Sequence, residues 1–152
     1  MAKRIAYIEN WEEWCQSFSF SHTQPVQFSD LDASGHLNHT KALVFFETAR
    51  IKFLQKIGVI DNRFINEYGT MVVAANIQCD YLRQVFFDEI ITTYLKIHRI
   101  GTSSIDLHYM AKNENEEVCF VGRGVMVNID RETGKARTWE NVFLEKFKDY
   151  VG

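Results

Sequence analysis

An apolar segment with the period of an α-helix constrains the fold of this chain most strongly. From position 40 the sequence reads TKALVFFETARIKFLQKIG, and apolar residues recur every three or four positions: Ala42, Phe46, Ala49, Phe53 and Ile57. This spacing predicts a helix. Because its first half is apolar most of the way round, other elements must cover it. Gly58 is expected to end the helix in the left-handed conformation.

Four segments after this helix have the composition of β-strands. Rich in β-branched and aromatic residues between polar breaks, they are Met71–Leu82, Glu89–His98, Thr102–Met110 and Val118–Ile129. A short strand, Val26–Phe28, is expected before the helix. This order predicts an α+β fold rather than alternating βαβ units, and the short links favour an antiparallel meander. We therefore expect a curved antiparallel sheet wrapped around one long buried helix.

Two glycines alternate on one face of the last predicted strand, Gly122 and Gly124. Without side chains, these positions would let a helix or a ligand approach the sheet closely. A β-bulge is the alternative explanation.

Length and composition restrict the domain organisation and the class of partner. With 152 residues the chain fits a single domain, 1–152, in which residues 1–21 form an N-terminal extension with one or two helical turns. Its paired tryptophans, Trp11 and Trp14, could pack to close the edge of the sheet, cover a pocket or contact another subunit. The net charge of −3 provides no basic field for nucleic acid, and no segment approaches the ~20 apolar residues of a membrane span. Three widely spaced cysteines favour reduced thiols, so a cytoplasmic location is expected.

A polar cluster directly precedes the apolar helix. The stretch FSDLDASGHLNHT contains two carboxylates, two histidines and an asparagine: Asp30, Asp32, His36, Asn38 and His39. These side chains could in principle bind a metal, but their spacing straddles a flexible glycine and no cysteine or distant histidine pair completes a site. We therefore expect neither a metal nor a cofactor. The sequence has no G-x-S-x-G or phosphate-loop motif to support a serine hydrolase or a nucleotide-binding protein.

The stretch DLDASGHLNH, followed by FFETAR on the helix, resembles the signature of hotdog-fold thioesterases. It is most similar to the 4-hydroxybenzoyl-CoA thioesterase-like family, with His39 where a second asparagine usually stands. It is also similar to the acyl-carrier-protein thioesterases, with Ser34 in place of their asparagine. The resemblance covers about Pro25 to Ile129. It implies a hotdog fold and a thioesterase that hydrolyses an acyl- or aroyl-CoA to the free acid and CoA.

The resemblance implies a role for each residue of the cluster. Asp32 would be the catalytic carboxylate, either as a nucleophile or as a base on water. The backbone N–H of His39, at the expected helix start, is the candidate oxyanion donor. Gly35 would leave room for the acyl group and let the loop take a positive φ. His36 could assist proton transfer or serve only structure, and Asn38 could brace the loop or cap the helix.

Three residues outside the cluster are further candidates for substrate binding. Glu47 lies on the apolar helix and could face the site, although it is also placed to pair with Arg50. Arg99 and Thr102 flank Gly101 at a turn between strands, where a cation and a hydroxyl could contact a phosphate of CoA.

The fold implied by the resemblance also predicts a homodimer or homotetramer, with the sheets of two subunits joined edge to edge and each site at the interface. Two other functions remain open: a non-catalytic module that binds acyl ligands, and a hydratase or dehydratase. A buried carboxylate beside an acyl chain argues against the binding module, and the spacing of the motif fits a thioesterase better than a hydratase.

Overall fold

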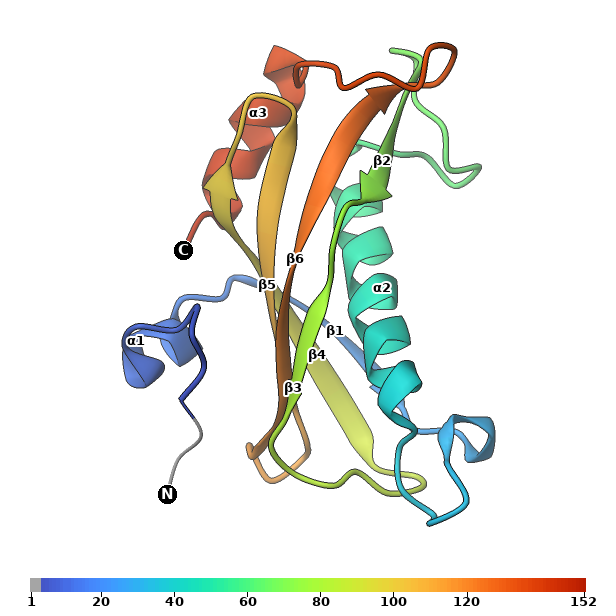
Figure 1. Cartoon of the computed structure of the whole chain (residues 1–152), viewed down its shortest axis with the longest axis vertical. Helices are drawn as coiled ribbons and strands as arrows, with labels where there is room; N and C mark the ends of the chain where they lie inside the picture. Colours follow the sequence, from blue (N-terminus) through green and yellow to red (C-terminus); the bar gives the residue numbers. More distant parts are fainter. Residues whose placement is uncertain (1–3) are drawn as a thin grey trace.

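The computed structural model describes residues 4–152, in which a six-stranded antiparallel sheet curves around one long helix (Figure 1). The helices are α1 (Trp11–Gln16), α2 (His39–Lys56) and α3 (Asn141–Phe147), with 3-10 turns at Phe28–Asp30 and Lys148–Tyr150. The strands are β1 (Phe20–Pro25), β2 (Thr70–Ala74), β3 (Gln78–Tyr81), β4 (Ile90–Ile100), β5 (Ser104–Lys112) and β6 (Val118–Asp130). The predicted α+β hotdog architecture is confirmed. No helix in the described part of the chain is long and apolar enough to cross a membrane.

The strand order corrects the predicted meander. The sheet runs β1-β4-β5-β6-β2, and β3 also pairs with β6. Strands β4, β5 and β6 form the expected meander, but the segment predicted as one strand, Met71–Leu82, is split and lies beside β6 rather than β4. At the break, Asn76 Oδ1 accepts the N–H of Val125 at 3.2 Å, so a side chain replaces the backbone carbonyl of a regular ladder.

The prediction of a strand at Val26–Phe28 is wrong. Strand β1 lies earlier, and its first residue, Phe20, falls inside the segment predicted as an N-terminal extension. The turn at Phe28–Asp30 forms because the Asp30 carboxylate accepts the N–H of Gln27 at 2.8 Å, while the Asp30 N–H donates to the Gln27 carbonyl at 2.9 Å. Helix α3 has no counterpart in the prediction; it buries Phe143 and Phe147.

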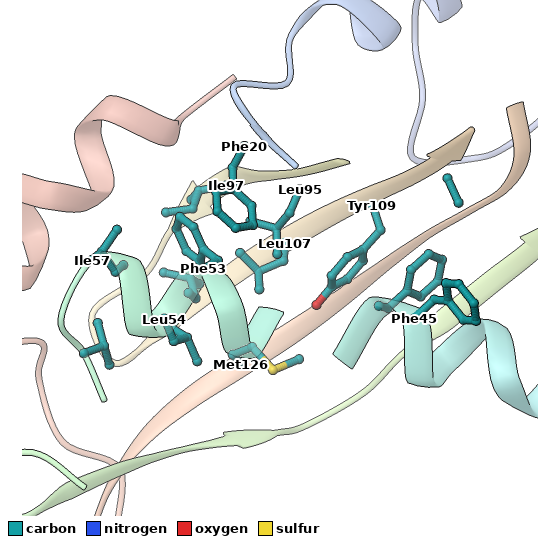
Figure 2. Packing of buried hydrophobic residues seen from close by; sticks show 14 of the residues in the cluster. Phe20, Phe45, Phe53, Leu54, Ile57, Leu95, Ile97, Leu107, Tyr109 and Met126 are labelled. Carbon is teal, nitrogen blue, oxygen red and sulfur yellow. The ribbon is translucent and has the colours of Figure 1, made fainter. Parts of the chain in front are cut away.

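Helix α2 supplies the centre of the core (Figure 2). Its buried face packs on the concave side of the sheet, where the Phe46 ring stacks on Tyr109 with centroids 4.5 Å apart. The helix ends as predicted, because Gly58 has φ +80° directly after the C-cap residue Ile57.

Helix α1 lies on the opposite side of the sheet from α2 (Figure 1). Trp14 is only 5% exposed and packs with Ile5, Met110 and Val121, which confirms the packing interpretation for this side chain. Trp11 stacks on Trp14 with ring centroids 5.7 Å apart but stays partly exposed. The outer face of the sheet therefore has its own small core.

Candidate active site

The loop before α2 closes on itself around Asp32. The Asp32 N–H donates to the His36 carbonyl at 2.8 Å, and the Gly35 N–H donates to the Asp32 carbonyl at 3.1 Å. This tight turn needs the positive φ of +80° that Gly35 adopts, as the sequence predicted. Asp32 Oδ1 accepts the N–H groups of Ser34 at 2.8 Å and His36 at 3.3 Å. No described residue donates to Oδ2, so one oxygen fixes the carboxylate while the other remains available.

Backbone hydrogen bonds hold this loop against the chain that leads into β4. The Leu37 N–H donates to the Val85 carbonyl at 2.7 Å, and His36 forms an isolated β-bridge with Phe86. The His36 ring packs edge-on against Phe86, with centroids 5.0 Å apart. The half-buried imidazole is therefore positioned by an aromatic contact beside Asp32.

The first turn of α2 begins beside this loop, and His39 lines the same cleft as Asp32. Asn38 is the N-cap residue, and its Oδ1 accepts from the Thr40 N–H at 2.9 Å and from the Thr40 hydroxyl at 2.8 Å. The N–H of His39, the first residue of the helix, has no acceptor among the described residues. The imidazole of His39 is exposed, and the Tyr81 hydroxyl donates to the His39 carbonyl. An unpartnered N–H at the positive end of a buried helix can stabilise a developing oxyanion.

A cleft of about 320 Å³ joins these groups. Asp32, His36, Leu37 and His39 line one side. The other lining residues come from the end of β3, the segment that follows it and β6: Tyr81, Leu82, Arg83, Gln84, Val85 and Phe120. Apolar side chains beside a few polar groups are typical of small-molecule sites.

Two further residues of this cleft are Tyr81 and Arg83. Burial, followed by the neighbouring Cys79, raises the pKa of Tyr81 to about 12, which keeps its hydroxyl protonated. Arg83 Nη2 forms an ion pair with Glu117 Oε2 at 2.7 Å. Tyr81 has no signal in the sequence, because it takes its place only through the pairing of β3 with β6.

The other predicted binding residues lie outside this cleft. The Glu47 side chain is 63% exposed and 3.7 Å from Arg50, the pairing that the helical spacing allowed. Arg99 and Thr102 are exposed at the turn between β4 and β5, whereas Asp32 lies beside the segment that precedes β4. At about 3.3 Å per residue, the 11 residues of β4 span roughly 33 Å. Within one subunit, Arg99 and Thr102 therefore cannot contact the same acyl group as Asp32.

The curved sheet, the buried helix and the polar loop at its N-terminus define a hotdog protein with one candidate active site per chain. A model of the thioesterase-like superfamily matches residues 26–147. The uncharacterized protein YsmA of Bacillus subtilis is 42% identical over 138 residues, covering 90% of this chain and 91% of YsmA.

Solved structures of similar proteins agree with this assignment. A predicted thioesterase from Bacillus stearothermophilus is 25% identical with a TM-score of 0.78, and the match covers 88% of this chain and 96% of that one. A thioesterase from Thermus thermophilus, complexed with coenzyme A and Zn, is 26% identical with a TM-score of 0.75 over 89% of this chain and 96% of that one. The chain belongs to the thioesterase-like superfamily.

Proposed function

We propose that this protein hydrolyses an acyl- or aroyl-CoA thioester to the free acid and CoA. The observation that carries the proposal is one cleft bordered both by the Asp32 carboxylate and by the start of α2, where the His39 N–H is unpartnered. Thioester hydrolysis needs a nucleophile or base at the carbonyl carbon and a donor at the developing oxyanion, and this cleft provides both. A coenzyme A complex of the Thermus relative supports a CoA-type substrate.

In the proposed reaction the thioester carbonyl oxygen accepts from the His39 N–H. Asp32 Oδ2 then either attacks the carbonyl carbon, expelling the CoA thiolate and forming a mixed anhydride that water hydrolyses, or removes a proton from the attacking water. Either route ends in a carboxylic acid and the thiol of CoA. His36 orients the loop that carries Asp32, and Asn38 holds the first turn of the helix in place.

The exposed edge of the sheet supports a homodimer or homotetramer as the functional form. Among the described residues, the strand pairing of β3 is with β6, which places β3 at an edge of the sheet next to the cleft. Large apolar side chains are exposed around the same end of the molecule, namely Phe28, Tyr81, Phe86 and Phe87. A second subunit on this edge would cover both the backbone groups and the apolar surface.

The test is release of free thiol from benzoyl-, hexanoyl- and palmitoyl-CoA by the wild type and Asp32→Asn. The substitution keeps the oxygen that accepts from Ser34 and His36 but removes the charge. We expect kcat to fall at least ~100-fold, the lower range for loss of a general base. The matched control is Asp88→Asn, because Asp88 is exposed outside the cleft and asparagine tolerates its φ of +67°.

Other results would overturn parts of this proposal. Equal turnover by wild type and Asp32→Asn would make Asp32 a loop residue only. Binding of acyl-CoA without turnover by either protein would identify a non-catalytic binding module.

A further inference from the structure

A second cavity lies on the face of the sheet opposite α2. It has a volume of about 550 Å³, and its lining comes from the N-terminal segment (residues 4–19), from β4, β5 and β6, and from Gly152. The N-terminal segment with α1 lies on this side of the sheet (Figure 1). None of the residues that line the Asp32 cleft lines this cavity. Its volume falls within the range of small-molecule sites.

The floor of this cavity is a row of polar side chains across the three central strands. Lys96 of β4 is the cross-strand neighbour of His108 of β5, which is the neighbour of Arg123 of β6. Side chains in such a row stand about 5 Å apart at Cβ. Lys96 is 4% exposed and His108 is 0% exposed, so water does not solvate these groups freely. Burial of this kind is costly unless each polar atom finds a partner.

The hydrogen bond from Trp14 fixes the state of His108. An indole N–H can only donate, and Trp14 Nε1 lies 3.0 Å from His108 Nδ1, so Nδ1 must be unprotonated. Burial, with the neighbouring His98 and Lys96 charges, lowers the pKa of His108 to about 3, which keeps the ring neutral. The proton therefore resides on Nε2. This buried N–H has no acceptor in the described part of the chain, although the ring lines the cavity.

The two cations of the row, Arg123 and Lys96, differ in whether they form an ion pair. Arg123 Nη2 pairs with Asp106 Oδ2 at 2.7 Å, while its Nε–H is buried without a partner. Lys96 Nζ donates to the Ser17 hydroxyl at 2.6 Å, and no described carboxylate side chain lies within 4.0 Å of it. Lys96 Nζ also lies over the rings of Trp14 and Phe18, 5.9 and 5.4 Å from their centroids, so this buried cation has polar and aromatic contacts but no ion pair with a described carboxylate side chain. Burial lowers the pKa of Lys96, as expected for a cation without a counter-ion.

We propose that this cavity is a second binding site, specific for a small organic monocarboxylate with an aromatic or apolar body. The carboxylate would supply one negative charge to Lys96 and acceptors to His108 Nε2–H and Arg123 Nε–H. The Trp14 and Tyr7 rings border the cavity and provide contacts for the body of the ligand. Glu9 and Glu13 also line it and are exposed, so they disfavour a dianion such as phosphate.

The test follows the indole N–H signals in a proton–nitrogen-15 spectrum during titration with sodium benzoate. Trp14 donates to His108 and should shift saturably. Trp139 donates to the Ser104 carbonyl at 3.0 Å, outside this cavity, and serves as the internal reference. Benzamide has the shape of benzoate without its charge, and inorganic phosphate tests whether any oxyanion suffices. We expect a Trp14 shift with benzoate and none with the other two compounds.

Two variants assign the shift to the proposed site. Lys96→Met removes the buried charge that has no ion-pair partner and should weaken benzoate binding at least tenfold, which corresponds to about 1.4 kcal/mol. Arg123→Lys keeps the ion pair with Asp106 but removes the Nε–H, and it provides a second measurement if Lys96→Met does not fold. In both, an unchanged Trp139 signal reports the fold. Asp32→Asn should bind benzoate at this site like the wild type, which separates it from product binding in the active site.

The proposal is overturned by several outcomes. These are no saturable Trp14 shift with benzoate, equal shifts with benzamide or phosphate, or benzoate affinity that neither Lys96→Met nor Arg123→Lys changes. Absence of thioesterase activity in the wild type would contradict the proposed function but not this site.

Discussion

The ring of Phe46 on α2 occupies the space that a side chain at Gly122 of β6 would take. The Cβ of an alanine at this position would lie 2.9 Å from Phe46 Cζ and would also approach the Gln78 carbonyl. Of the two explanations for the alternating glycines, close approach of the helix is therefore confirmed at Gly122. The contact lets α2 sit deep in the sheet, with Phe46 stacked on Tyr109.

Replacement of Gly122 by alanine should destabilise the protein by about 1–3 kcal/mol, the usual cost of overpacking a core. Gly124→Ala is the matched control on the same strand. Its Cβ would lie 2.9 Å from the Asn76 carbonyl oxygen, 3.0 Å from Ile77 Cδ1 and 3.3 Å from Met126 Cε, so this position is crowded as well, but less closely than Gly122. Urea unfolding should show the larger loss for Gly122→Ala. Adding Phe46→Leu to Gly122→Ala should recover part of that loss, and strictly additive effects would contradict the packing argument.

The sequence was sufficient to predict the fold because its strongest signals are local. The period of residues 42–57 and the glycine at position 58 define α2, and β-branched composition locates β4, β5 and β6. Two of the errors occur where a side chain replaces a backbone partner. Asn76 interrupts the expected long strand, and the Asp30 carboxylate turns the chain at Phe28–Asp30 into a 3-10 turn. Neither effect has a periodic signal.

The sequence predicted the residues on only one side of the candidate site. The loop residues are adjacent in sequence, so the motif brings Asp32, His36 and His39 together without any knowledge of the sheet. The opposite wall depends on pairing between β3 and β6, and its residues, such as Tyr81, could not be found from local pattern. Residues predicted to bind one substrate can also be separated by the length of a strand. Arg99 lies at the far end of β4 from Asp32.

Asn38 should contribute separately to stability and to activity. Asn38→Ala removes the acceptor for the Thr40 N–H, and we expect a loss of about 0.5–2 kcal/mol in thermal or urea unfolding. Asn38→Asp keeps an acceptor and adds a charge that the helix N-terminus favours, so stability should be retained. The same charge would lie beside the His39 N–H and oppose a developing oxyanion. A lower kcat for Asn38→Asp with unchanged stability would support the oxyanion role, and unchanged kcat would count against it.

His108 should make the protein less stable in mild acid. Its pKa is about 3 in the folded protein and near 6.5 in the unfolded chain, so the unfolded state binds more protons between these values. The contribution of His108 to the free energy of unfolding should therefore be fully present above about pH 6.5. It should fall as the pH drops toward 3, by at most about 1.4 kcal/mol per pH unit.

Comparison with His108→Gln isolates this contribution from that of the carboxylates. Glutamine can accept from Trp14 Nε1 and does not titrate in this range. Urea unfolding at several pH values should show a shallower slope for the variant. Parallel curves for the two proteins would show that His108 is protonated in the folded state as readily as in the unfolded chain.

Arg99 provides a test of where the CoA moiety binds. We propose that Arg99 and Thr102 contact a phosphate of CoA only across a subunit interface, because β4 separates them from Asp32 within one chain. Arg99→Ala should then raise KM for an acyl-CoA several-fold at unchanged kcat. It should not alter KM for the same acyl group on pantetheine, which lacks the nucleotide phosphates. Lys135→Ala removes another exposed cation near a turn and serves as the control for general electrostatic attraction. Equal effects of Arg99→Ala on both substrates would argue for a structural role of this turn.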